Sequence, residues 1–299
     1  MKNEKYKLLF FKISSYLASF LCILTISILI NNLTQHLKEE AAYSILDMQL
    51  NETDEFRKMQ LSGEALAKIQ EILVGREEEV GELLLVLMTE NKLDLRNWDF
   101  ENYTYKIFRD SFSKKWLQKP EIIEALSASY NAVWQDIEFF PVPASTNPTR
   151  KPVAYEDSWM FERNYGGRRG HEGTDIMAGD NEAGIYPIIS MTKGVVTNIG
   201  WLEQGGYRIG ITSPSGGYFY YAHLSSYERE FVLGEAIQAG QLLGYMGDTG
   251  YSTVEGTTGM FDVHLHLGVY IKTRQGKEIS VNPYWILKSL EESKLKYDY

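Results

Sequence analysis

The sequence is poor in cysteine and in net positive charge, and each shortage argues against a class of function. The only cysteine, Cys22, lies in an apolar segment near the N-terminus, so the chain has no intrachain disulfide and no cluster of thiolate metal ligands. Any metal must therefore bind to nitrogen and oxygen atoms. The formal net charge is -10 and the basic residues form no dense stripe, which argues against a nucleic-acid-binding surface.

One long uncharged run is present near the N-terminus. Residues 13–30, ISSYLASFLCILTISILI, carry no charge, and the preceding LLFF extends the run to roughly 20 residues, enough for one membrane span. Lysines precede the run and acidic residues follow it. We therefore expect a cytoplasmic tail over residues 1–12, a transmembrane anchor over 13–32 and the rest of the chain outside the cell membrane. A cleavable signal peptide is the alternative, but no small-residue cleavage site ends the run.

The character of the sequence changes twice after this run. Residues 33–140 are expected to be mostly helical, because they contain amphipathic windows such as GEALAKIQEILVG. Residues 141–155 are rich in proline and small polar residues, which predicts an extended linker. Residues 156–290 contain short β-like runs between Gly-rich turns, which predict a mainly antiparallel β domain. The predicted fold class is α+β.

Four of the five histidines fall in the predicted β domain. In DVHLHLGVYI, residues 262–271, apolar and polar residues alternate, so His264 and His266 point to one face of a strand and an apolar row points to the other. By itself, such a pair is better explained as ordinary solvated surface. His223, in YFYYAHLSS, would by itself be read as a surface or packing histidine near the end of a strand.

A second short motif places His171 and Asp175 four residues apart in GGRRGHEGTDIMA. The glycines favour a loop that enters a strand, and Gly173 is expected to let the backbone fold so that both side chains converge. Two imidazoles and one carboxylate form a common catalytic zinc set, in which one coordination position stays open for water.

Taken in order, HxGxD, YAHL and HLH resemble the motifs of the lysostaphin- and LytM-type zinc metallopeptidases, which cut peptide bonds in bacterial peptidoglycan. The resemblance covers roughly residues 165–270 and does not extend to the helical region. The zinc ligands that it implies are His171, Asp175 and His266. It also implies that His223 and His264 are catalytic histidines beside the metal, in a groove of the β domain.

The implied function is that of a membrane-anchored zinc metalloendopeptidase of the bacterial envelope. It would hydrolyse peptide cross-links or stem peptides of peptidoglycan through a zinc-activated water, with the helical region as a spacer or as the docking site of an envelope partner. The alternative is a non-catalytic or latent scaffold that binds the cell wall or a partner protein, and in the latent form Asn147 or Asp157 would reach the metal. The intact set of four histidines and one aspartate favours catalysis.

Two further features of the sequence concern the groove wall and a candidate second activity. Compared with the family pattern, the chain has extra residues before the HLH motif, and Leu267 stands where the family usually has an aromatic residue, so we expect an altered groove wall. Glu90, at the end of an apolar helical window, weakly resembles the general-acid glutamate of lytic transglycosylases. The adjoining serine of that family is missing, so we expect an ordinary glutamate at a helix end.

Overall fold

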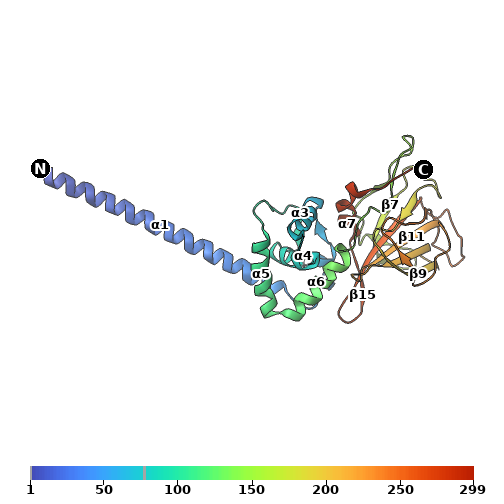
Figure 1. The fold of residues 1–299 in the computed structure, drawn as a ribbon, viewed down its shortest axis with the longest axis horizontal. Helices are drawn as coiled ribbons and strands as arrows, with labels where there is room; N and C mark the ends of the chain where they lie inside the picture. Colours follow the sequence, from blue (N-terminus) through green and yellow to red (C-terminus); the bar gives the residue numbers. More distant parts are fainter. Residues whose placement is uncertain (1, 77–78) are drawn as a thin grey trace. The chain divides into compact units, whose positions relative to one another are not determined.

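The structure is a computed structural model that describes residues 2–76 and 79–299 (Figure 1). Residue 1, at the start of the predicted tail, and residues 77–78, in the predicted helical region, lie outside the described residues. The chain divides into two compact units, Met1–Ile45 and Leu46–Tyr299, and each is described by itself.

The first unit is a single long helix, α1 (Lys2–Ile45). Its segment Ser15–Leu37 spans 23 residues and is long and apolar enough to cross a membrane, although a signal sequence has the same properties. Large apolar side chains such as those of Phe20 and Ile23 are exposed along this segment. The predicted apolar helix is therefore confirmed as a helix.

The second unit begins with the helices of the region that the sequence predicted to be helical. These are η1 (Leu50–Glu52), α2 (Asp54–Arg57), α3 (Gly63–Leu73), α4 (Val80–Glu90), α5 (Tyr105–Gln118) and α6 (Pro120–Trp134). Ser62 caps α3 by accepting a hydrogen bond from the Ala65 amide, and Thr104 caps α5 in the same way. The apolar sequence of α4 is almost wholly buried and packs against α5 and α6, so α4 is the core of this helical part.

The rest of the unit is built on a ten-stranded sheet whose recorded pairs are all antiparallel. Its main path runs in the order β12-β9-β10-β11-β14-β7-β4, and β13, β8 and β15 join beside it. The strands are β4 (Ala154–Tyr155), β7 (Thr174–Met177), β8 (Pro187–Ile189), β9 (Gly194–Leu202), β10 (Gly206–Thr212), β11 (Tyr218–Tyr227), β12 (Ala236–Ile237), β13 (Leu242–Met246), β14 (His264–Lys272) and β15 (Glu278–Val281). The predicted antiparallel β domain is confirmed.

Short elements complete the fold. Strands β1 (Gln60–Leu61) and β2 (Asp94–Leu95) pair in parallel, as do β3 (Ala144–Ser145) and β16 (Lys296–Tyr297). Strands β5 (Glu162–Arg163) and β6 (Arg169–Gly170) form a small antiparallel hairpin. Helix α7 (Pro283–Ser289) and the turn η2 (Glu291–Ser293) precede the C-terminal strand.

Strand β14 shows the alternation that the sequence predicted. Leu265, Leu267 and Val269 are fully buried on its apolar face. His264 and His266 project from the opposite face, where β14 pairs with β7 on one side and β11 on the other. The expectation that Leu267 alters the groove wall is wrong, because the pleat of the strand turns this side chain into the core.

The helical part and the sheet are joined by hydrogen bonds within the second unit. Arg57 of α2 donates from Nε to the carbonyl oxygen of Ser280 and from Nη2 to its hydroxyl, both at 2.8 Å. The amide of Asn282 in turn donates to the Arg57 carbonyl at 2.7 Å. Residues 141–155 contribute β3 and β4 to the strands of this unit. The predicted division into a helical region, a linker and a peptidase domain stays a prediction.

Candidate metal centre

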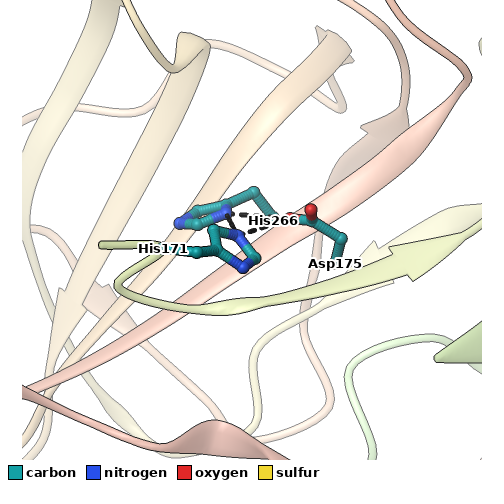
Figure 2. Close-up of side chains that lie close together, drawn as sticks. All are labelled: His171, Asp175 and His266. Atoms are coloured by element: carbon teal, nitrogen blue, oxygen red, sulfur yellow. Dashed lines mark hydrogen bonds and ion pairs between the residues drawn. The ribbon is translucent and has the colours of Figure 1, made fainter. Parts of the chain in front are cut away.

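Strand pairing positions two of the three predicted metal ligands. In the register of β7 and β14, Asp175 lies directly opposite His266. His171 lies in the loop before β7, where its amide donates to the Phe161 carbonyl at 2.8 Å and its own carbonyl accepts from Met160 at 2.7 Å. These backbone hydrogen bonds hold the loop against the hairpin side of the site, so the His171 side chain reaches the other two (Figure 2).

Gly173, between His171 and Asp175, is needed for space. A Cβ atom at this position would lie 2.5 Å from Cε1 and 2.6 Å from Nε2 of the His266 ring. The sequence predicted a glycine that frees the backbone to turn. His171 and Asp175 do converge, and the structure adds that the ring of His266 occupies the volume that any side chain at position 173 would fill.

Three potential ligand atoms converge at the centre of the site (Figure 2). Nε2 of His171, Nδ1 of His266 and Oδ1 of Asp175 lie 3.0 Å from one another in all three pairings. The site is largely enclosed, and His171 is only 2 % exposed. Tetrahedral zinc with ligand distances of about 2.0–2.1 Å requires donor atoms about 3.3 Å apart, so the spacing of this set fits the metal.

One tautomer of His171 leaves its inner nitrogen available as a ligand. Nδ1 lies 3.1 Å from the Ser158 carbonyl oxygen, which can only accept, and 3.2 Å from Arg163 Nη2, which can only donate, so these two contacts favour opposite tautomers. In one of them the ring proton is on Nδ1 and is donated to Ser158. The lone pair of Nε2 then faces Asp175 and His266. Ligand atoms at this spacing are held together either by protons shared between the imidazoles and the carboxylate or by a cation that replaces those protons, and the second arrangement is a metal site.

Asp175 has different neighbours at its two oxygens. Oδ1 faces the two histidines, whereas Oδ2 accepts from Arg163 Nη2 at 2.6 Å. Burial by itself raises the pKa of Asp175, but the hydrogen bonds with His171 and His266 outweigh it and hold this pKa well below its usual value. The carboxylate is therefore ionised, as a metal ligand must be.

His223 and His264 lie beside this set. Their ring centroids are 4.7 Å apart, and Nε2 of His264 is 3.7 Å from Oδ1 of Asp175. Nδ1 of His223 lies 2.7 Å from the Thr249 carbonyl oxygen, and Nδ1 of His264 lies 2.7 Å from the Asp262 carbonyl oxygen. A carbonyl oxygen only accepts, so both rings carry a proton on Nδ1 and keep Nε2 as a proton acceptor when neutral.

The backbone at His223 is unusual. Its φ of 62° lies in the left-handed region, which residues other than glycine seldom adopt. Strand β11 pairs with β14 as far as Ala222 and with β13 from Leu224 onward, so His223 stands where the strand changes partner. Burial, followed by the nearby His264 and His266, lowers the pKa of His223 well below its usual value, so this imidazole is neutral at pH 7.

Comparison with known proteins places this arrangement in a family. The family model described as Peptidase family M23 matches residues 169–283. A solved structure from Ruminococcus gnavus ATCC 29149, described as a glycyl-glycine endopeptidase lytM, is 44% identical over 87% of this chain and 99% of that chain, with a TM-score of 0.68. The chain belongs to peptidase family M23. The resemblance inferred from the three short motifs is confirmed.

Two curated proteins extend the comparison of this M23 chain. The L-Ala--D-Glu endopeptidase of Bacillus subtilis (strain 168) is 39% identical over 160 residues, which are 54% of this chain and 44% of that protein. Lysostaphin of Staphylococcus simulans is 36% identical over 69 residues, which are 22% of this chain and 14% of that protein. The M23 chain thus spans less than half the length of these curated relatives.

Two cavities flank the histidines of the M23 site. One, of about 520 Å³, is lined by all five residues that the sequence singled out, together with Tyr220 and Arg208. The other, of about 670 Å³, shares Asp175 and His264 with the first and is bordered by aromatic residues. Its aromatic lining consists of Tyr155, Phe161, Tyr165, Tyr251 and Phe261. A ligand therefore has room beside the five site residues and, in the second cavity, beside Asp175 and His264.

Arg163 was not predicted from the sequence, because it belongs to the β5–β6 hairpin and contacts Asp175 only in the folded structure.

Asn147 and Asp157, which would reach the metal in a latent form, have other partners in the structure: Asn147 accepts from Thr149, and Asp157 accepts from Asn282. Glu90 is the last residue of α4, as expected, and pairs with the buried Lys115 at 2.7 Å.

Proposed function

We propose that this M23 chain is a membrane-anchored zinc metalloendopeptidase that hydrolyses stem peptides of bacterial peptidoglycan. The observation that carries the proposal is the convergence of three ligand atoms at 3.0 Å beside two histidines that both keep Nε2 free. A scaffold that only binds the cell wall has no need for this complete set.

His171, Asp175 and His266 would hold the zinc through Nε2, Oδ1 and Nδ1. A bound zinc ion supplies Lewis acidity, which makes an attacking water more acidic and the scissile carbonyl more electrophilic. Arg163 orients the ligand carboxylate by occupying Oδ2, so that Oδ1 stays directed at the two histidines.

His223 and His264 move the proton. Each ring is held by a hydrogen bond from Nδ1 to a backbone carbonyl, which leaves Nε2 directed away from that carbonyl as the proton acceptor. Because the pKa of His223 is lowered, chiefly by burial, this residue stays neutral and competent to accept at pH 7. The pair therefore takes a proton from the attacking water and returns one to the departing amine.

The names of the relatives supply two candidate bonds, L-Ala–D-Glu and glycyl-glycine. The Ruminococcus gnavus protein, 44% identical over 87% of this chain, is described by the glycyl-glycine bond, and the Bacillus subtilis enzyme, 39% identical over 160 residues, by the L-Ala–D-Glu bond. We propose the L-Ala–D-Glu bond, on the match to the Bacillus subtilis enzyme. Digestion of purified peptidoglycan by the full chain, followed by mass spectrometry, tests this choice. New N-terminal D-Glu is the expected product, whereas new N-terminal glycine, or no new terminus, would overturn it.

The anchor is part of the same proposal. Helix α1 holds an apolar segment of 23 residues, and lysines lie on its N-terminal side. The N-terminus would then be cytoplasmic and the second unit extracytoplasmic, where peptidoglycan is present. An envelope protein that docks on the helical part stays a prediction.

A further inference from the structure

Three arginines lie around the M23 site, and they differ in what their guanidinium groups contact. Arg163 is occupied by Asp175. Arg169 and Arg208 line the cavity of about 520 Å³ that also contains the five site residues. Among the residues that the structure describes, Nε of Arg169 and Nη1 of Arg208 are buried and have no hydrogen-bond partner. A guanidinium group with an unpartnered buried donor is poorly satisfied by the protein, and an anionic ligand in the cavity would bind to its other N–H groups.

Tyr220 is a neighbour both of His266 and of the two arginines. Its ring centroid lies 6.1 Å from that of His266, and Tyr220 lines the same cavity. Burial and the neighbouring Tyr218 raise the pKa of Tyr220, while the positive charges of Arg208 and Arg169 oppose the rise. Both guanidinium groups are therefore close enough to act on a residue that neighbours a metal ligand.

The same cavity also contains acidic residues, Glu172 and Glu278. Burial, followed by the carboxylate of Glu172, raises the pKa of Tyr270. The cavity wall thus carries both carboxylates and guanidinium groups, and an anionic group of a ligand will bind at the guanidinium groups.

We propose that Arg169 and Arg208 form a carboxylate-binding subsite that holds the α-carboxylate of D-Glu next to the scissile bond. The inference rests on the proposed function, because it assigns a role within cleavage of L-Ala–D-Glu. In stem peptides D-Glu continues through its γ-carboxyl, so its α-carboxylate is free and is attached to the same carbon as the scissile nitrogen. A glycyl-glycine bond carries no such group. Two guanidinium groups beside the metal therefore select for an acidic residue after the cleaved bond.

The test uses two synthetic muramyl tetrapeptides that differ only in the second residue, which is D-Glu in one and D-isoglutamine in the other. The amide of D-isoglutamine removes the charge and keeps the shape. We expect the zinc-loaded full chain to cleave the D-Glu peptide with a kcat/KM about 10-fold higher, mainly through KM. Arg208→Gln and Arg169→Gln should each remove most of this preference, so that the ratio of kcat/KM on the two peptides falls toward one.

Arg168→Gln is the matched control. Arg168 adjoins Arg169 in sequence, but its side chain is 82% exposed and pairs with Glu162 at 3.0 Å. This variant should keep the full preference for D-Glu. Equal kcat/KM of the unaltered chain on the two peptides would overturn the subsite while leaving the proposed function intact. Loss of both activities in Arg208→Gln would assign that arginine to folding and would also overturn the subsite. Cleavage of neither peptide by the unaltered chain would reject the proposed function and the subsite together.

Discussion

The two oxygens of Asp175 have different partners. Oδ1 is directed at Nε2 of His171 and Nδ1 of His266, and Oδ2 is held by Arg163 at 2.6 Å. Groups that orient a ligand in this way commonly change metal affinity by about 10–100-fold when they are removed. Such a group cannot be recognised from spacing in the sequence, because Arg163 belongs to no motif of the site.

Arg163→Gln should weaken zinc binding by about 10–100-fold, because the carboxylate loses the partner that fixes its orientation. The measurement is competition with a zinc chelator of known affinity, which reports binding independently of turnover. Arg168→Gln serves as the control and should bind zinc like the unaltered chain. Equal zinc affinities of the Arg163 and Arg168 variants would show that the Oδ2 contact has no effect on the metal.

The lowered pKa of His223 has a consequence for stability in acid. The folded chain resists protonating this residue, whereas the unfolded chain protonates it near the ordinary histidine pKa of 6.5. As the pH falls below about 6.5, the unfolded state binds more protons than the folded state, so the free energy of unfolding decreases. Histidine burial therefore makes the metal-free protein less stable at pH 5 than at pH 7.

His223→Asn should reduce this loss of stability, because asparagine does not titrate and tolerates the left-handed backbone that His223 adopts. Thermal melting of the chelator-treated protein at pH 7, 6 and 5 gives the comparison. The unaltered chain should lose more of its Tm over this range than the variant. Identical losses in the two proteins would mean that His223 is not the group that titrates.

At the scale of single residues, the convergence of the candidate site could be predicted. The donor types and their order along the chain singled out the four histidines and Asp175, and the structure brings them to one cavity, whereas their roles stay predictions. A second constraint on Gly173 could not be predicted: the ring of His266, 93 positions further along the chain, fills the space of a side chain there, and no local pattern contains it. The unpartnered donors of Arg169 and Arg208 likewise depend on tertiary burial.

At the scale of elements, strand β14 was predictable and strand β11 was only partly so. The period of two in HLHLGVYI follows from the pleat of a strand, so the buried and the functional faces could be read directly. The conformation of His223 could not, because it depends on β11 leaving β14 for β13 at that residue. A change of partner strand is a property of the sheet and leaves no local sequence period.

Helix α1 predicts a cytoplasmic N-terminus, and the chain has only one cysteine to remove before introduced cysteines are labelled. In a Cys22→Ser background, a cysteine at Asn3 should resist a membrane-impermeant maleimide in intact cells, whereas a cysteine at the exposed Glu230 should react. Both positions should react after the cells are lysed. Labelling of the Asn3→Cys chain in intact cells would contradict a cytoplasmic N-terminus.

At the scale of the whole molecule, the second unit joins helices and sheet more closely than the sequence indicated. Arg57 bonds to Ser280 in β15, and the Glu138 amide donates to the Met191 carbonyl at 2.9 Å. Composition changes along the chain locate where helices give way to strands. They contain no information about whether the two parts share hydrogen bonds and a packed interface.

Truncation tests how far the helical part supports the sheet. A chain that begins at residue 141 loses the Arg57 contacts and the helices that pack on the sheet, so its Tm should fall by about 5 °C or more. A chain that begins at Leu46 keeps the compact unit whole and should melt like the full chain. Equal Tm values for the two truncated chains would show that the peptidase part is stable without the helices.

Zinc content and peptidoglycan cleavage, measured together on the full chain and on His266→Ala, test the proposed zinc endopeptidase most directly. We expect about one zinc per unaltered chain and release of stem-peptide fragments. We also expect that His266→Ala loses the zinc and at least about 1,000-fold in activity. An unaltered chain that carries zinc and cuts no bond in peptidoglycan would contradict the proposed function and favour a metal-containing scaffold.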